Sequence, residues 1–360
     1  AALMGVTIGL GLLAKYAAIY FVLSLVFWLV VDRSARTAIS PGKLAVAALF
    51  ILAILAPNIA WNVENGLITF LHTKDNINWE GELIRPAEAA EFFGAQFGVF
   101  GPIPMALLLW IAFRPPDMST EAERRLRMMV IFSLPIVAII VFQALMSRAH
   151  ANWAAPAYVA GTLGVTAYLV ITGRRMLLYA TLALHAIVPF IFIVGDTQAR
   201  TLKFPGEIDP YYRTLGYGDL ARASNRLFEA GDYMAILTDW RRTTGTHLYY
   251  LRDAPPPIVT WPANPRPTDH FQMSRPLTAD LEGPFLLVTA CNERTRLDAA
   301  FESWKLVDTI ITKGGPRYNW IFFAVEVSGP KWGEMPPPDC HRWAYKEDLV
   351  PRADLPPRRE

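Results

Sequence analysis

The stretch Leu44–Trp61 reads LAVAALFILAILAPNIAW and carries no charged side chain. A helix needs roughly 20 apolar residues to cross the hydrocarbon core of a bilayer, which is about 30 Å thick. The stretch therefore predicts a transmembrane helix. Four further stretches have the same character, namely Phe92–Phe113, Met128–Met146, Ala154–Thr172 and Met176–Val194. We expect an integral membrane protein that spans the bilayer several times.

Another apolar stretch, Leu3–Val31, is interrupted by Lys15. It is either one long tilted helix or two spans that meet at a short turn. A lone lysine deep in lipid costs about 2.5–3.5 kcal/mol on insertion scales, and a turn that faces a cavity avoids part of this cost. We therefore favour a turn at Lys15, which brings the prediction to about six or seven helical spans. Gly5, Gly9 and Gly11 have the spacing of residues that let two helices pack closely.

Composition divides the chain in two. Apolar residues make up 53% of its 360 residues, the mean hydropathy is +0.25, and the long apolar runs all precede Gly195. We predict a transmembrane region at 1–194, a small soluble α/β domain at 195–335 and a Pro-rich, charged tail at 336–360. The net charge of +2 gives no indication of a nucleic-acid partner.

Basic residues alternate from one loop to the next. The basic loops contain Arg33, Arg36 and Lys43, then Arg114, Arg124, Arg125 and Arg127, then Arg174 and Arg175. Loops 62–91 and 147–153 are poorer in Lys and Arg for their length. By the positive-inside rule the basic loops are cytoplasmic. The other two loops and everything after Val194 then face outward, which in a bacterium means an inner-membrane protein with a periplasmic C-terminal domain.

The soluble part contains both cysteines, Cys291 and Cys340. Their number and spacing match no metal site. In an oxidising compartment they can form a disulfide, and two unpaired thiols are an equally consistent interpretation.

The first outward loop carries His72, Lys74, Asp75 and Asn76 directly after an apolar segment. This cluster suits the binding of an anionic head group such as a phosphate, with Lys74 as a compact charge. A divalent metal ion held by His72 and Asp75 is a further option. The alternative is an ordinary solvated loop.

The second outward loop places Arg148, His150, Asn152 and Trp153 within six positions. A ring beside hydrogen-bonding groups is a common way to bind a sugar. An aromatic belt with a snorkelling arginine has the same composition. His185 is a lone histidine inside a predicted span, and we expect it to make a hydrogen bond between helices.

The soluble part alternates strand and helix patterns. We predict strands at Met234–Thr238, Pro284–Thr289 and Ile321–Val327, and helices at Trp240–Leu251 and Leu297–Val307. This alternation predicts an α/β domain with a mainly parallel sheet.

Several stretches together resemble the bacterial glycosyltransferase family 39 group, which includes protein mannosyltransferase-like and aminoarabinose transferase-like enzymes. In the membrane part they are GLGLLAKYAAIYFVL at Gly9–Leu23, PNIAWNVENGLITF at Pro57–Phe70, EFFGAQFGVFGPIPMALLLW at Glu91–Trp110 and HANWAAPAY at His150–Tyr158. The soluble part contributes YGDLARASNRL at Tyr217–Leu227. The order and spacing of these stretches match across nearly all of the membrane part.

The resemblance implies a GT-C membrane fold and a transferase that takes a sugar from a polyprenyl-phosphate carrier, with inversion, on the outer side of the membrane. The acceptor would be a lipid, a glycan or a protein. Lys15, His72, Lys74 and Asn76 are the candidates for carrier binding. His150, Asn152 and Trp153 are the candidates for the sugar or the acceptor.

In this family an acidic residue in an earlier outward loop acts on the acceptor, and this sequence shows no such loop ahead of Leu3. We therefore expect an N-terminally truncated and inactive chain whose catalytic acid cannot be named. Two other interpretations are a transporter subunit and a non-catalytic membrane scaffold with a periplasmic binding domain. A transporter would place ionisable residues inside several spans, whereas the polar residues here gather at helix ends.

Overall fold

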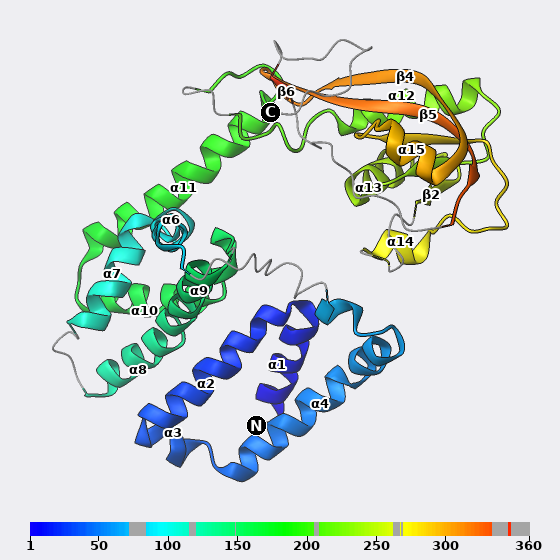
Figure 1. Ribbon diagram of the computed structural model, residues 1–360. Coiled ribbons are helices and arrows are strands. Elements are labelled where there is room, and N and C mark those ends of the chain that lie inside the picture. The colour runs from blue at the N-terminus through cyan, green and yellow to red at the C-terminus, as the bar shows by residue number, and fades with distance from the viewer. Residues whose placement is uncertain are drawn as a thin grey trace. The chain divides into compact units, whose positions relative to one another are not determined.

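The computed structural model describes residues 1–71, 84–114, 120–147, 149–204, 209–261, 267, 269–332 and 345–346. The chain divides into two compact units, Ala1–Phe190 and Ile191–Glu360, and Figure 1 labels most of their elements. We refer to them as the helical unit and the sheet unit and describe each by itself.

The described part of the helical unit contains α-helices and two short 3₁₀ turns. They are α1 (Ala2–Ala14), η1 (Tyr16–Ala18), α2 (Ile19–Val31), α3 (Arg33–Ala38), α4 (Pro41–Glu64), α6 (Pro86–Val99), α7 (Pro102–Phe113), α8 (Thr120–Ile131), α9 (Leu134–Met146), η2 (Ala151–Ala154), α10 (Ala157–Ile171) and most of α11 (Arg175–Thr197). Among the described residues, α4, α11 and the stretch Glu121–Met146 are each long and apolar enough to cross a bilayer. The bent pair α6–α7 makes a fourth candidate, and α1, α2 and α10 are shorter apolar helices.

The predicted turn at Lys15 is confirmed. Helix α1 ends at Ala14, and Lys15 is extended, with φ −161° and ψ 127°. The chain then makes the 3₁₀ turn η1 and enters α2 at Ile19. Lys15 itself is exposed, so its ammonium group is not enclosed among apolar side chains.

The prediction of one continuous span at Phe92–Phe113 is wrong. The segment forms α6 and α7, which are bent by 112° relative to one another. At the corner, Gly101 has φ +95°, a conformation that glycine adopts at no steric cost and that ends a helix. Pro102 then begins α7, where its missing N–H is no loss.

Close packing of α1 on α4 confirms the packing interpretation for Gly5 and Gly9, whereas a Cβ atom added to Gly11 would meet Ala18 instead. A Cβ atom added to Gly5 would lie 2.8 Å from Cβ of Phe50, and one added to Gly9 would lie 3.1 Å from Cβ of Ile54. Ala47 is buried at this contact. Small residues four positions apart thus allow the two backbones to approach, as in other membrane helix pairs.

The sheet unit contains a six-stranded sheet with the order β2-β1-β3-β5-β4, and β6 pairs with β5. Its strands are β1 (Ile236–Thr238), β2 (Ile258–Thr260), β3 (Phe285–Thr289), β4 (Phe301–Lys313), β5 (Tyr318–Pro330) and β6 (Tyr345–Lys346), and its helices are α12 (Tyr217–Ala230), α13 (Arg241–Tyr250), α14 (His270–Ser274) and α15 (Arg294–Ala300). Tyr345–Lys346 is the described part of the predicted tail 336–360.

The sheet is mixed, so the prediction of a mainly parallel sheet is wrong. Strands β1, β2 and β3 are mutually parallel, but β5 is antiparallel to β3, β4 and β6. The predicted helix Leu297–Val307 is also wrong, because α15 ends at Ala300 and the chain continues as β4. Strand β4 pairs along its length with β5, and this long hairpin outweighs the local helix pattern (Figure 1).

Two apolar cores lie against the sheet. One contains Leu220 of α12 with Ile236, Leu286 and Val288 of the strands. The other contains Leu297 of α15, together with the alternate strand residues such as Leu237 and Leu287. Because successive strand residues point to opposite faces, the central strands β1 and β3 are buried on both faces. The predicted strands at Met234–Thr238, Pro284–Thr289 and Ile321–Val327 and the helix at Trp240–Leu251 are confirmed.

Candidate functional site

The turn at Lys15 is held against the C-terminal end of α4. Tyr16, the next residue, donates a hydrogen bond from Oη to Oδ1 of Asn58, with an O···O distance of 2.9 Å. Asn58 in turn accepts, at its backbone carbonyl, a 2.9 Å hydrogen bond from Nδ2 of Asn62. Inside an apolar bundle such groups must find partners within the protein. The chain of amides therefore fixes where Lys15 lies relative to α4.

Asn62 also directs the chain as it leaves α4. Its side chain is buried, and its Oδ1 accepts a hydrogen bond from the backbone N–H of Thr69 (3.3 Å). Its carbonyl accepts another from the N–H of Leu67 (2.6 Å). Leu67 has φ +59°, which costs a non-glycine residue about 1–3 kcal/mol. These hydrogen bonds hold the strained turn in place.

The chain returns from this turn to the Lys15 region. The ring of Phe70 stacks on the ring of Tyr16, with centroids 5.9 Å apart and planes 21° apart. Residues 72–83 follow almost at once. The structure thus brings Lys15 beside the start of the loop that carries His72, Lys74 and Asn76, while those three residues lie outside the described part of the chain.

The other end of that loop is anchored beside the second outward loop. The backbone N–H of Arg85 donates a 2.8 Å hydrogen bond to the carbonyl of Leu145, near the end of α9. The side chain of Arg85 is 14% exposed and forms an ion pair with Glu88, with an N···O distance of 3.5 Å. Phe70, shortly before residues 72–83, thus contacts Tyr16, and Arg85, shortly after them, is hydrogen-bonded to Leu145, two residues before Ser147, where the second loop begins.

His150, Asn152 and Trp153 are brought together by the 3₁₀ turn η2. The N–H of Trp153 donates a 2.9 Å hydrogen bond to the carbonyl of His150, and their rings meet edge to face with centroids 5.3 Å apart. His150 and Asn152 are exposed, whereas Trp153 packs partly on the helical core. An imidazole, an amide and an indole edge are thus presented together. Arg148 lies outside the described residues.

Gln96 and Tyr158 support this turn, and the sequence analysis did not single them out. The hydroxyl of Tyr158 donates a 2.7 Å hydrogen bond to Oε1 of Gln96, and Nε2 of Gln96 donates to the carbonyl of Phe92 (2.8 Å). The ring of Tyr158 stacks on Phe100 at 4.3 Å. The contact fixes the start of α10 against α6. Gln96 is a lone glutamine inside an apolar stretch, and this pattern was the sequence signal that could have indicated a buried hydrogen bond there.

His185 makes the predicted hydrogen bond between helices. Its Nε2 lies 3.1 Å from the carbonyl oxygen of Phe100, and its Nδ1 lies 2.8 Å from the carbonyl oxygen of Thr181 in its own helix. A Cβ atom added to Gly101 would lie 2.6 Å from Cε1 of His185. The histidine therefore ties α11 to the corner between α6 and α7, which is a structural role.

Comparison with known proteins reveals two similarities. The family described as dolichyl-phosphate-mannose-protein mannosyltransferase matches residues 2–61, the segment that contains Lys15, Tyr16 and Asn58. The lipid A galacturonosyltransferase RgtD of Rhizobium johnstonii (strain DSM 114642 / LMG 32736 / 3841) is 32% identical over 289 residues, which are 80% of this chain and 60% of that relative. Both similarities support the resemblance of this chain to the glycosyltransferase family 39 group. No solved structure matches it.

The family 39-like chain spans 60% of the length of the relative that it matches. Its match to the mannosyltransferase family ends at Trp61 and so covers α1, α2, α3 and most of α4. The family resemblance inferred from the sequence is thereby confirmed. Lys15, Tyr16 and the residue that accepts the hydrogen bond of Tyr16, Asn58, all lie inside the matched segment.

Two further predictions concern residues outside the described part of the family 39-like chain. The described residues contain no group of three or more His, Cys, Asp and Glu that could hold a metal ion, and His72 and Asp75 are not among them. Binding of a metal ion by these two residues stays a prediction. Cys291 is buried after β3, but Cys340 lies outside the described residues, so their pairing also stays a prediction.

Proposed function

We propose that this chain is the membrane part and attached domain of a glycosyltransferase that moves a sugar from a polyprenyl-phosphate carrier to a lipid, glycan or protein acceptor. The observation that carries the proposal is the Lys15 turn, an exposed cation fixed at the base of loop 72–83 by Tyr16, Asn58 and Phe70. The similarity to two kinds of glycosyltransferase supports the same reaction class.

Lys15 suits the phosphate of the carrier. An ammonium group is a compact charge with three donors, and here it sits on an extended residue between two apolar helices. When the sugar leaves, negative charge grows on the carrier phosphate. A cation that is already in place stabilises this charge most strongly in a partly dry site. His72, Lys74 and Asn76 would add to the same site from the adjoining loop.

The turn at His150, Asn152 and Trp153 suits the sugar or the acceptor. The amide and the imidazole offer hydrogen bonds to hydroxyl or carboxylate groups, and the indole offers an apolar edge. The relative acts on lipid A and transfers galacturonic acid, as its name states. Galacturonic acid and lipid A are therefore the first donor sugar and the first acceptor to test.

We place the reaction on the periplasmic side and expect inversion at the anomeric carbon. Lys43, in a basic loop, lies at the N-terminal end of α4, whereas the Lys15 turn contacts Asn58 near the C-terminal end. The two positions are about 22 Å apart along the helix, at 1.5 Å per residue. The positive-inside rule then assigns the Lys15 end to the outside. We assign no catalytic acid among the described carboxylates.

The test measures transfer in membranes that contain the full-length protein, with radiolabelled polyprenyl-phosphate galacturonic acid as donor and lipid A as acceptor. Carrier binding is measured in parallel by photo-crosslinking of an azido polyprenyl phosphate. Lys15→Ala should lower both signals about tenfold or more, the loss of one charge-assisted hydrogen bond. Lys15→Arg should retain part of each signal, and Lys43→Ala serves as the matched lysine control.

His150→Ala and Trp153→Ala should lower transfer while leaving carrier crosslinking intact, because they are assigned to the sugar or the acceptor. Equal transfer and equal carrier crosslinking by Lys15→Ala and Lys43→Ala would show that Lys15 does not bind the carrier. Absence of both transfer and crosslinking with every polyprenyl donor would overturn the proposed function as a whole.

A further inference from the structure

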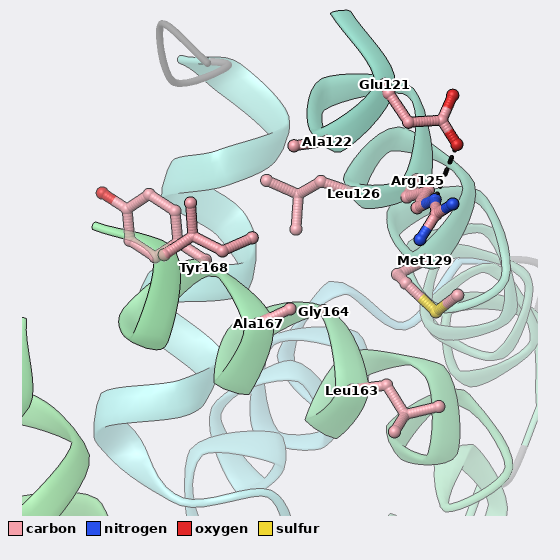
Figure 2. Close-up of a pocket in the computed structure, with 10 residues that line it drawn as sticks. Glu121, Ala122, Arg125, Leu126, Met129, Leu163, Gly164, Ala167 and Tyr168 are labelled. Atoms are coloured by element: carbon pink, nitrogen blue, oxygen red, sulfur yellow. Dashed lines mark hydrogen bonds and ion pairs between the residues drawn. The ribbon is translucent and has the colours of Figure 1, made fainter. Parts of the chain in front are cut away.

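A cavity of about 420 Å³ opens between α8 and α10 in the helical unit. Figure 2 shows Leu126 and Met129 of α8 on one side, and Leu163, Ala167 and Tyr168 of α10 on the other. Its volume falls within the roughly 300–1,000 Å³ typical of small-molecule sites. The walls are mainly apolar, so the cavity suits a hydrocarbon chain.

Small residues shape this cavity. A Cβ atom added to Gly164 would lie 2.9 Å from Cβ of Met129, so α10 approaches α8 as closely as a glycine allows. Ala167, one turn later, is exposed and lines the cavity. Because Ala167 is small, it leaves unfilled the space that a larger side chain would take. Leu163 is 59% exposed, so the cavity opens onto an exposed apolar part of the helical unit.

One end of the cavity is lined by one acidic and one basic residue, Glu121 and Arg125. Glu121 forms ion pairs with Arg124 and with Arg125, the latter at 2.7 Å, and the dashed line in Figure 2 marks the Arg125 pair at the rim. The side chain of Arg125 is 74% exposed. Near the end of α10, the guanidinium of Arg174 lies 5.5 Å from the ring centroid of Tyr168.

Arginines outnumber acids on these elements. Helix α8 carries Arg124, Arg125 and Arg127 against Glu121 and Glu123, and Arg174 follows α10, which leaves two positive charges in excess (four minus two). These are residues of the basic loops. A membrane surface rich in anionic lipids attracts such residues by about 1 kcal/mol each.

We infer that this cavity binds one acyl chain of an anionic glycerophospholipid, whose phosphate lies at Arg125. The apolar walls take the chain, and the positive excess on α8 and just after α10 complements the head group. The site is separate from the proposed transferase site, because η2 precedes the start of α10 at Ala157 whereas the cavity lies along its second half. The ligand comes from the leaflet on the side of the basic loops.

The experiment measures lipid binding to the full chain by native mass spectrometry in detergent, with phosphatidylglycerol and phosphatidylcholine as probes. Phosphatidylglycerol should bind more tightly. Ala167→Trp, which fills the cavity, should weaken that binding about tenfold or more. Thr166→Trp is the matched control, because Thr166 is an exposed neighbour on α10 that does not line the cavity. The Thr166→Trp variant should bind phosphatidylglycerol as tightly as the unmodified chain does.

Charge variants give a second, independent measurement. Arg125→Gln should weaken phosphatidylglycerol binding about fivefold, the equivalent of about 1 kcal/mol. Glu121→Gln should strengthen it, because the substitution releases Arg124 and Arg125 from their ion pairs. Arg33→Gln, in a different basic loop, should leave it unchanged, and inorganic phosphate should not compete. Equal binding of the two lipids, or equal binding by Ala167→Trp and Thr166→Trp, would overturn the inference.

Discussion

The helical unit and the sheet unit bury different kinds of polar group. In the described part of the helical unit, the fully buried polar side chains are neutral: Ser24, Asn62, Gln96, Ser133 and Ser147. The sheet unit buries charged or ionisable groups, among them Asp239, Arg296 and His247. In the described part of the helical unit no charged side chain is fully buried, and Lys15 and Arg125 are exposed.

The buried charges of the sheet unit tie together the carboxyl ends of two parallel strands. Nη1 of Arg296 donates a 2.8 Å hydrogen bond to Oδ2 of Asp239, which follows β1, and the hydroxyl of Thr289, at the end of β3, donates to the same oxygen (2.9 Å). The guanidinium of Arg296 lies 5.0 Å from the ring centroid of Trp261, which follows β2. The arrangement of the loops that follow β1 and β3 therefore depends on the ion pair between Asp239 and Arg296.

The two units therefore differ in how much their stability depends on buried polar contacts. A hydrogen bond between membrane helices contributes only about 0.6 kcal/mol on average, because the unfolded helices find other partners in the bilayer. Removing one half of a buried ion pair in a water-soluble unit leaves an uncompensated charge and costs far more. The buried polar groups of the helical unit thus set the path of the chain, as Asn62 does after α4, and contribute less to stability.

Asp239→Ala should break the sheet unit most severely. It leaves Arg296 buried without its carboxylate, and we expect a loss of about 3–5 kcal/mol. Amide hydrogen exchange of β1 and β3 in the whole protein measures the free energy of opening. Arg222→Ala, which removes an exposed ion pair with Asp219, is the control and should cost about 0–1 kcal/mol. A similar loss in both variants would contradict the distinction.

The stability of the sheet unit should fall in mildly acidic solution because of His247. Burial lowers the pKa of His247 to about 4, from about 6.5 when unfolded. Between these values the unfolded chain binds a proton that the folded chain does not, so stability falls as pH drops from about 6.5 to 4, by roughly 3 kcal/mol in all. Above pH 6.5 the residue contributes no pH dependence.

Hydrogen exchange of β1 at a series of pH values, corrected for the intrinsic exchange rates, measures this loss. The pH dependence should disappear in His247→Gln and persist in His270→Gln, because His270 is exposed. A His247→Gln protein that keeps the full dependence would show that other groups titrate in this range.

Gly5→Ala should separate α1 from α4 in the helical unit. The added Cβ would meet Cβ of Phe50 at 2.8 Å as well as the backbone of Ala47, and overpacking of this kind costs about 1–3 kcal/mol. Unfolding by sodium dodecyl sulfate in bicelles, followed by circular dichroism, measures the loss. Gly94→Ala, where an added Cβ meets nothing within 4 Å, should be neutral or stabilise by up to about 1 kcal/mol. Equal losses would argue against close packing.

Tyr16→Phe should have the smallest effect on stability. It removes the hydrogen bond to Asn58 but keeps the ring that stacks on Phe70, so we expect a loss of about 0.6 kcal/mol in the same unfolding assay. Tyr179→Phe, at an exposed position on α11, is the control and should leave stability unchanged. If Tyr16→Phe lost as much stability as Asp239→Ala, the proposed difference between the two units would be wrong.

Local patterns in the sequence predicted a good part of the fold. The turn at Lys15, the glycine contact between α1 and α4, and strands β1 and β3 follow from local features: a charge in an apolar run, glycines four residues apart, and short apolar runs. The corner at Gly101 was missed because α6 and α7 together have the length and hydropathy of a single span. Strand β4 was missed because its pairing with β5 is non-local.

The candidate site was predicted only in its exposed residues. Lys15, His150, Asn152 and Trp153 stand out as polar groups at the ends of apolar runs. The supporting residues Asn58, Asn62, Gln96 and Arg85 were not predicted from the sequence. A single polar residue near or within an apolar stretch does not reveal which residue it will contact. Their roles depend on contacts such as that of Tyr158 with Gln96, 62 positions apart.

The sequence by itself therefore determined that this protein belongs in a membrane, where most of its apolar helices lie, and which family it resembles, because hydropathy and motif order are local properties of the chain. Only the tertiary structure decided that Tyr16 and Phe70 hold Lys15 beside loop 72–83 and that α8 and α10 leave a cavity between them. These features depend on side chains far apart in sequence that meet through packing, and no local pattern records such meetings.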